Sequence, residues 1–250
     1  MIQLTIIKIT GYGPWTLTLG SDREHRLQIL QASLYKEIQN LFSERNCLAF
    51  PNRFDEIFVI TNGLSVVDHI EIQKELAKSF QLSVSMSIGQ GKTPYEANLN
   101  ADKSRRSKIT LDKEHNIFGM PLQKGEDLVQ IIHMDVDGST SISANHSPYE
   151  VSSLILRLYS EMSEFFLPRN SLTFFMGGDN FMIVSSGIDK ENIAKFLDLV
   201  KQRHGLSFNC GIGTAKTGRN AAKLATKSLD KIRELRESGT KEQRILELTC

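Results

Sequence analysis

The two halves of the sequence carry the same pattern of apolar residues. A helix-spaced run of apolar and aromatic side chains between Leu30 and Phe42 recurs between Leu154 and Phe166, where each position is the earlier number plus 124. The same shift carries 82–89 onto 206–213. One copy is about half of the 250 residues. We therefore interpret the repeat as a tandem duplication of a small domain, because a solenoid would need several short repeats.

Each half predicts the same order of elements: a strand, a helix, a β-hairpin, a second helix, a fourth strand and a closing helix. The ranges are 3–9, about 22–42, 47–60, 68–80, 82–88 and 94–103 in the first half, and 129–135, about 148–167, 172–185, 189–203, 206–212 and 220–237 in the second. This strand–helix–strand–strand–helix–strand order is the ferredoxin-like α+β plan. We expect helices on one face of each sheet and an open second face. The run 244–248 is a possible extra edge strand.

A polar stretch separates the two copies. Asp102–Glu126 contains mostly charged and small residues and has little to bury, so we expect the domain boundary there. The predicted domains are 1–110 and 126–250.

Composition limits the classes of function. The formal net charge of +1 gives no basic field for nucleic acid and no acidic tail. No apolar stretch approaches the roughly 18 residues that span a bilayer, and the three cysteines form no Cys-x-x-Cys pair. We expect a reduced, cytoplasmic protein that binds neither membranes nor nucleic acid.

The hairpin in the second half has an unusual tip. Two apolar strands flank Gly177, Gly178, Asp179 and Asn180. Such a sequence is typical of a tight turn, because glycine accepts a positive φ without a Cβ penalty. A tip built of glycines is also thin, so a phosphate or metal ion can approach its backbone while Asp179 presents a carboxylate. Turn chemistry alone is the alternative reading.

A second carboxylate motif follows the first strand of this half. Strand alternation puts His133, Asp135 and Asp137 on one face, and a ferredoxin-like sheet brings Asp135 beside Asp179. With the backbone carbonyl of Val136, these carboxylates form an oxygen-only site suited to Mg²⁺. Asp-x-Asp-Gly-Ser is otherwise ordinary loop chemistry. His133 is a candidate for proton transfer, or a sheet histidine with a structural role.

Further residues are candidates for contacts to a nucleotide. The phosphate candidates are Ser139 and Thr140 after the strand, and Lys216 and Lys231, which bracket a row of basic residues on the closing helix; a solvated helix face is the alternative for that row. Tyr12, beside Trp15, is placed to stack on a purine or to pack a helix onto the sheet.

The first half keeps only part of the site. Asp55 takes the place of Asp179, while Arg53 and Phe54 replace the two glycines. Aligning the first strands by their apolar residues, at an offset of 125, puts Thr10 in the place of Asp135. We therefore expect one metal site per chain. The first copy would form a wall of that site, a dimer surface, or a surface that recognises the base through residues such as Phe54.

Several motifs together resemble a known family. The strand end His133-x-Asp135 and the tip Gly177–Phe181 look like the palm-type core of nucleotidyl cyclases, diguanylate cyclases and polymerases. The whole chain is more similar to the archaeal GTP cyclohydrolase III (IIa) family. The matching residues are Met1–Gln3, Tyr12–Thr16, Arg53–Asp55, Ile60–Gly63, Ser85–Met86, Thr93–Ala97, His133, Asp135, Gly177–Phe181, Gly211–Gly213 and Lys231–Arg233.

The resemblance implies a specific activity. It implies an oligomeric (dimeric or tetrameric), Mg²⁺-dependent enzyme that opens the imidazole ring of GTP. The product would be a formylamino-pyrimidine nucleotide monophosphate, with release of inorganic phosphate, in flavin and deazaflavin synthesis. Asp135, Asp179 and His133 would be catalytic, and the tip glycines and Asn180 would contact the nucleotide. A nucleotidyl or diguanylate cyclase and a non-catalytic GTP sensor are the alternatives.

Overall fold

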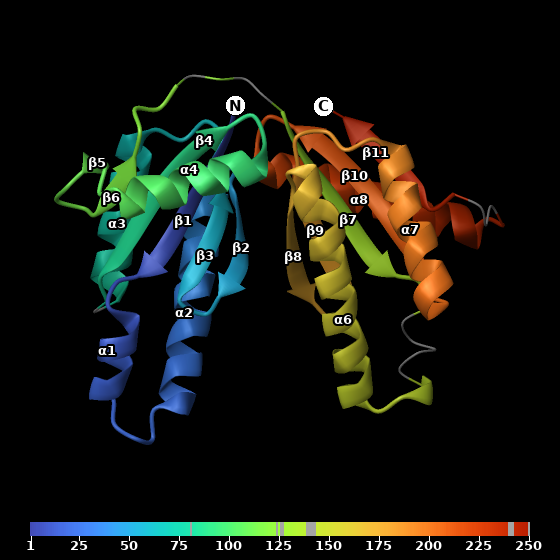
Figure 1. Ribbon diagram of the computed structural model, residues 1–250, viewed down its shortest axis with the longest axis horizontal. Coiled ribbons are helices and arrows are strands. Elements are labelled where there is room, and N and C mark those ends of the chain that lie inside the picture. The colour runs from blue at the N-terminus through green and yellow to red at the C-terminus, as the bar shows by residue number, and fades with distance from the viewer. Residues whose placement is uncertain (81, 124, 126–127, 139–143, 240–242, 250) are drawn as a thin grey trace. The chain divides into compact units, whose positions relative to one another are not determined.

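The chain forms two compact units, each built around one sheet. The structure is a computed structural model that describes residues 1–80, 82–123, 125, 128–138, 144–239 and 243–249. The first unit comprises Met1–Lys92 and Glu96–Asp127, and the second comprises Thr93–Tyr95 and Leu128–Cys250. In Figure 1 the first unit runs from blue to green and the second from yellow-green to red.

The first unit has a six-stranded sheet in the order β2-β3-β1-β4-β6-β5. Its elements are β1 (Ile2–Ile9), α1 (Tyr12–Thr18), α2 (Glu24–Ser43), β2 (Leu48–Arg53), β3 (Glu56–Ile60), α3 (Val66–Ser79), β4 (Val84–Gly91), α4 (Pro94–Arg106), β5 (Thr110–Asp112) and β6 (Ile117–Gly119). The central order β2-β3-β1-β4, with antiparallel neighbours, is that of the ferredoxin-like fold.

The second unit repeats this plan in a five-stranded sheet of order β11-β10-β7-β9-β8. Its elements are β7 (Val129–Val136), α6 (Pro148–Phe166), the 3-10 turn η1 (Leu167–Arg169), β8 (Leu172–Gly177), β9 (Asn180–Ser185), α7 (Lys190–His204), β10 (Phe208–Ala215), α8 (Gly218–Glu237) and β11 (Ile245–Thr249). The extra edge strand is confirmed, because β11 pairs parallel with β10. The duplicated ferredoxin-like α+β fold is therefore confirmed.

The core of each unit lies between one sheet face and two helices. In the second unit, Met134 of β7 and Cys210 of β10 pack against α6 and α7, as do their neighbours at alternate positions. The amphipathic run around Phe166 supplies the helical side of this core. A capping box at Ser147 and Glu150 fixes the start of α6. The equivalent cluster of the first unit includes Phe42 of α2.

The expectation that the second face of each sheet is open is wrong. Helix α8 lies on that face of the second unit, so close that a Cβ on Gly213 would come within 2.1 Å of the Ala221 carbonyl oxygen. A Cβ on Gly211 would meet the Ala225 carbonyl oxygen at the same distance. Helix α4 covers Gly89 in the first unit in the same way. Small residues on strand and helix allow this contact, and they bury a face that the ferredoxin-like plan alone leaves bare.

Two other local expectations also differ from the structure. The residues between the first strand and the first predicted helix, with Tyr12 and Trp15, form the short helix α1, which is not among the predicted elements. The polar stretch Asp102–Glu126 holds the strands β5 and β6, and Ile117 of β6 is fully buried beside β4. This stretch therefore completes the first sheet as β11 completes the second.

The register of the first strands corrects the alignment of the two copies. Lys8 pairs with Glu56 and Ser85, and Asp135 pairs with Asn180 and Asn209. Since 56 and 85 plus 124 give 180 and 209, Lys8 is the structural equivalent of Asp135. The backbone N–H of Thr10 donates to Ser83, as that of Asp137 does to Ser207. Thr10 therefore corresponds to Asp137, and its predicted match to Asp135 is wrong.

Candidate functional site

The candidate site lies where β7 ends and the β8–β9 hairpin turns (Figure 1). Asp135 of β7 is the ladder partner of Asn180, the first residue of β9, so the tip with Asp179 is adjacent to it. Gly177 and Gly178 have φ angles of +103° and +62°, which glycine adopts without strain. The tip is thus a tight glycine turn that carries one carboxylate beside the end of β7.

Asp135 is a buried carboxylate with one oxygen left over. Its side chain faces α8, and its Oδ2 accepts a hydrogen bond of 2.6 Å from Nη2 of Arg233. Its Oδ1 is buried and has no hydrogen-bond partner among the described residues. The pKa of Arg233 is raised, mainly by this hydrogen bond and also by the charges of Asp135, Asp230 and Asp179. The charges of Asp135 and Asp179, which were predicted from the sequence to lie close together, therefore both act on Arg233.

Asp137 is held by two more arginines. Its Oδ1 accepts from Nη1 of Arg236 at 2.5 Å, and its Oδ2 accepts from Nη1 of Arg244 at 3.0 Å. Burial alone would raise the pKa of Asp137, but these hydrogen bonds and charges outweigh it and the pKa is lowered. Arg233, Arg236, Glu237 and Arg244 line a cavity of about 480 Å³.

Arg233, Arg236 and Arg244 were not predicted as site residues from the sequence. The predicted row of basic residues runs from Lys216 to Lys231. Arg233 and Arg236 lie beyond it, three residues apart on α8, and contact Asp135 and Asp137. The three-residue spacing of Arg233 and Arg236 was the feature of the sequence that could have identified them as site residues.

His133 belongs to a hydrogen-bonded chain that ends at Asp179. Its Nε2 lies 3.1 Å from Oδ1 of Asn180, and Nδ2 of Asn180 donates to Oδ1 of Asp179 at 3.0 Å. Because an amide oxygen only accepts, Nε2 carries the proton and Nδ1 accepts from Thr226 Oγ1 at 3.2 Å. Burial is the main cause that lowers the pKa of His133. The neutral imidazole therefore orients the amide that holds Asp179.

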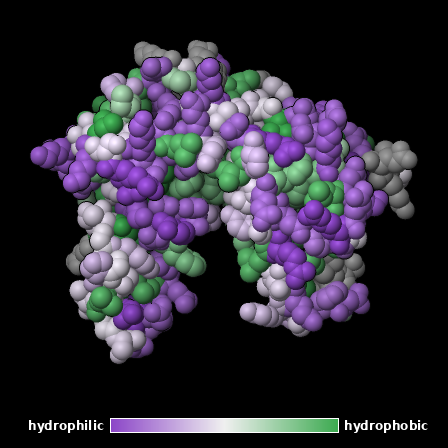
Figure 2. Space-filling model, in the orientation of Figure 1, coloured by the Kyte–Doolittle hydropathy of each residue, from purple (hydrophilic) through white to green (hydrophobic). Residues whose placement is uncertain are grey.

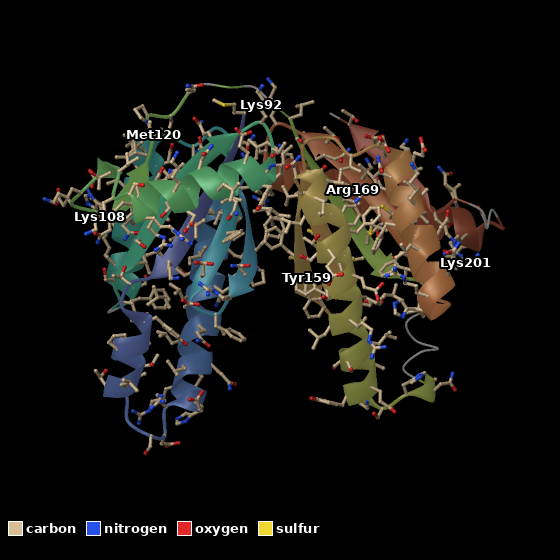
Figure 3. All side chains as sticks on the ribbon, viewed as in Figure 1. Lys92, Lys108, Met120, Tyr159, Arg169 and Lys201 are labelled. Atoms are coloured by element: carbon tan, nitrogen blue, oxygen red, sulfur yellow. The ribbon has the colours of Figure 1, made fainter. Side chains whose placement is uncertain are left out.

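An apolar cavity of about 460 Å³ opens beside the hairpin tip. Side chains of α6 form one wall, and Gly178 and Asp179 lie at its edge. The remaining lining comes from Val136, Phe175 and Leu206, and the α6 residues are Val151, Ser152, Leu154, Ile155, Leu156 and Leu158. Tyr159, marked in Figure 3, stacks near Phe181 with ring centroids 6.5 Å apart. The cavity thus combines an apolar wall with one carboxylate at its edge.

Other predicted residues are placed as follows. Ser139 and Thr140 lie outside the described residues. Lys216 is exposed before α8, and Lys231 is half-buried on it. Tyr12 is on α1 of the first unit, where its hydroxyl is hydrogen-bonded to Gln31. Phe54 is 77% exposed at the β2–β3 turn. Roles for these residues in nucleotide binding stay predictions.

The equivalent position in the first unit carries its own positive charge. Nζ of Lys8 lies 3.4 Å from Oε2 of Glu56 and 3.9 Å from Oδ2 of Asp55. Arg53 is also close to Asp55, with Nε 3.6 Å from Oδ1. The first unit therefore neutralises these carboxylates with its own side chains.

The surface in view in Figure 2 is mostly hydrophilic, with hydrophobic residues in small groups. No helix in the described part of the chain is long and apolar enough to cross a membrane.

Comparison with known proteins shows one family over nearly the whole chain. The family model described as GTP cyclohydrolase III matches residues 1–244. The curated protein named GTP cyclohydrolase III of Methanothermobacter thermautotrophicus is 35% identical over 236 residues, which cover 93% of this chain and 95% of that protein. The protein of the same name from Methanocaldococcus jannaschii is 33% identical over 249 residues, covering 93% and 88%. That of Methanobrevibacter smithii is 31% identical over 245 residues, covering 94% of each.

Solved structures match about half of the chain. One is the GGDEF domain of DgcB from Caulobacter crescentus in complex with c-di-GMP, with 12% identity, coverage of 48% of this chain and 77% of that chain, and a TM-score of 0.39. Another is an EAL/GGDEF domain protein from M. capsulatus, with 20% identity, coverage of 49% and 87%, and the same TM-score.

Proposed function

The chain belongs to the GTP cyclohydrolase III family, and from this membership we propose that it hydrolyses GTP. The reaction proposed is opening of the guanine imidazole ring to a formylamino-pyrimidine nucleotide monophosphate, with release of inorganic phosphate. We place it in flavin or deazaflavin biosynthesis in the cytoplasm, and we propose that the enzyme is a homo-oligomer.

The observation that carries the proposal is the buried, unpartnered Oδ1 of Asp135 beside the glycine tip that presents Asp179. A carboxylate oxygen without a partner in a buried place is costly unless a donor or a cation reaches it. Asp135, Asp179, Asp137 and the carbonyl of Val136 offer only oxygen atoms, which suits Mg²⁺. When bound, the ion would lower the pKa of a bound water and neutralise charge on the phosphates.

The arginines fit the phosphate chain of the substrate. Arg233, Arg236 and Arg244 line one cavity. Arg233 binds the carboxylates of Asp135 and Asp230, and the other two arginines share that of Asp137. Guanidinium groups bind phosphate oxygens through paired hydrogen bonds. A triphosphate would take over some of these bonds and release carboxylate oxygens toward the metal.

The apolar cavity beside the tip fits the base. Its volume of about 460 Å³ is within the range of small-molecule sites. The α6 side chains would pack against a purine face, and Gly178 would let the nucleotide approach the backbone. His133 would hold Asp179 in place beside the metal through Asn180.

A product measurement tests the proposal. The purified chain is incubated with GTP and Mg²⁺ while the guanine absorbance and the released phosphate are followed. Loss of the purine spectrum together with orthophosphate release supports ring opening. Pyrophosphate with an intact purine would instead identify a cyclase. A GTP sensor would bind GTP without turnover, and steady turnover that disappears in Asp179→Asn excludes it.

A further inference from the structure

We propose that Asn209 is a further metal-ligand residue, whose amide oxygen binds the same divalent cation as Oδ1 of Asp135. This inference rests on the proposed function, because the divalent cation is part of that proposal.

Asn209 and Asp135 are neighbours by register. They are direct partners in the antiparallel ladder between β10 and β7. Residues in such a pair project to the same face of the sheet, with Cβ atoms about 5 Å apart. Asn209 is 3% exposed and Asp135 is 8% exposed, so both side chains are buried. One cation is therefore within reach of both groups.

Each of the two residues has a buried oxygen atom that nothing in the described chain satisfies. These atoms are Oδ1 of Asn209 and Oδ1 of Asp135. Arg233 donates to the other carboxylate oxygen of Asp135. Two neighbouring buried acceptors raise the free energy of the folded state when no donor or cation replaces their lost hydration. A cation between them removes that cost for both atoms at once.

The face of β10 explains why a polar side chain stands here. Gly213, Gly211 and Asn209 project toward α8, and at the two glycines the helix backbone leaves no room for a Cβ. Of these three positions, Asn209 is the one that carries a side chain. An aliphatic residue there would simply extend the packing, whereas an amide places a neutral oxygen ligand beside a carboxylate.

The first unit shows what the position requires. Its equivalent pair is Lys8 and Ser85. The ammonium group of Lys8 supplies a positive charge, and Ser85 donates to the Lys8 carbonyl oxygen at 3.4 Å. Neither side chain carries a buried unpartnered atom. In the second unit the guanidinium of Arg233 reaches only Oδ2 of Asp135, and Oδ1 of Asp135 and Oδ1 of Asn209 have no donor among the described residues. This difference points to a cation taken from solution.

Binding of Mn²⁺ to the full chain without nucleotide tests the inference. Asn209→Leu keeps the size of the side chain and removes its oxygen, whereas Asn209→Asp keeps an oxygen and adds charge. We expect Asn209→Leu to weaken Mn²⁺ binding by about 10-fold, the order found for residues that support metal sites. Asn209→Asp should bind Mn²⁺ more tightly than the wild type, and Asp135→Asn should lose binding. Exposed Lys223→Gln on α8 is the control.

The outcomes separate this inference from the proposed function. If Asn209→Leu binds Mn²⁺ as the wild type does while Asp135→Asn does not, a buried water satisfies Asn209 and the inference is wrong, but the metal at Asp135 stands. If neither variant changes binding, both the inference and the proposed metal site are wrong. Should Asn209→Leu fail to fold, Asn209→Asp decides, because affinity at or below that of the wild type contradicts a ligand role.

Discussion

Lys8 of the first unit and Asp135 of the second occupy the same ladder position in two copies of one fold, with opposite charges. The duplication thus kept the backbone and reversed the electrostatics of one position. In the first copy an ammonium group lies near two carboxylates. In the second copy a carboxylate lies beside the tip that carries another carboxylate. For this reason we assign the metal site that we propose to the second copy.

Replacing Lys8 by methionine should destabilise the protein. Asp55 and Glu56 would then lose their shared cation, and Arg53 alone would remain near them. For partly exposed pairs of this kind we expect a loss of about 1 kcal/mol, which lowers the unfolding midpoint by roughly 2–4 °C for a chain of this size. Thermal unfolding followed by circular dichroism measures the effect. Lys8→Arg should keep the wild-type midpoint, and an unchanged Lys8→Met midpoint would show that the charge is unnecessary.

Adding one methyl group at Gly213 should disturb α8. The new Cβ would lie 2.1 Å from the Ala221 carbonyl oxygen and 2.4 Å from the Ala225 nitrogen, so the helix must move. We expect Gly213→Ala to cost about 1–3 kcal/mol, with reduced GTP turnover because α8 carries Arg233 and Arg236. Gly13→Ala is the matched control, since its Cβ would meet no atom within 4 Å. Equal stability of the two variants in urea unfolding would contradict the close packing of α8.

His69 should make stability depend on pH. It is buried, with Nε2 2.8 Å from Thr5 Oγ1 and Nδ1 2.7 Å from the Ser65 carbonyl oxygen. Burial is the main cause of its lowered pKa, so the folded state keeps the ring neutral. Below the pKa of an unfolded histidine, about 6.5, this imidazole binds a proton in the unfolded chain but stays neutral in the folded chain. The free energy of unfolding should therefore be independent of this group above that pH and fall below it.

Urea unfolding between about pH 8 and about pH 5 checks this prediction. The acid-side loss of stability should be smaller in His69→Gln than in the wild type, because that variant has no ring to protonate. Identical slopes would assign the pH dependence to other groups.

Removing Arg236 should weaken GTP binding. Its guanidinium lines the basic cavity and binds Asp137. If it contacts a phosphate in the complex, Arg236→Met should raise KM for GTP by about 10-fold or more, which corresponds to about 1.4 kcal/mol. Steady-state kinetics measure this, with Lys223→Met, an exposed residue of the same helix, as the control. A similar KM in both variants would remove Arg236 from the phosphate site.

The repeat in the sequence was enough to predict the duplicated fold, because helix spacing and the hairpin residues recur at one offset. The repeat did not give the correct alignment of the two first strands, and the reason is physical. Seven of the eight residues of β1, all except Lys8, are buried, since helices cover both sheet faces. Without an alternation of buried and exposed positions, an apolar pattern does not define the register of a strand. Only the hydrogen-bond ladder revealed that Lys8 matches Asp135.

The arginine contacts and the proposed role of Asn209 could not be predicted from the sequence, for a related reason. Both depend on α8 lying on the face that the ferredoxin-like plan leaves open. The small residues Gly211, Gly213, Ala221 and Ala225 allow that contact, but each is also common in sheets and helices that make no such contact. Asp135 and Asp179, by contrast, were predictable because their positions follow from strand order alone.

The initial rate of GTP consumption by Asp179→Asn and Asp55→Asn, measured side by side with Mg²⁺, tests the central claim most directly. The two residues hold equivalent hairpin positions, and the first-strand residue beside the hairpin tip is the carboxylate Asp135 in the second copy and Lys8 in the first. We predict that Asp179→Asn lowers the rate by orders of magnitude, while Asp55→Asn stays within a few-fold of the wild type. Equal losses in the two variants, or an active Asp179→Asn, would contradict a single catalytic site in the second unit.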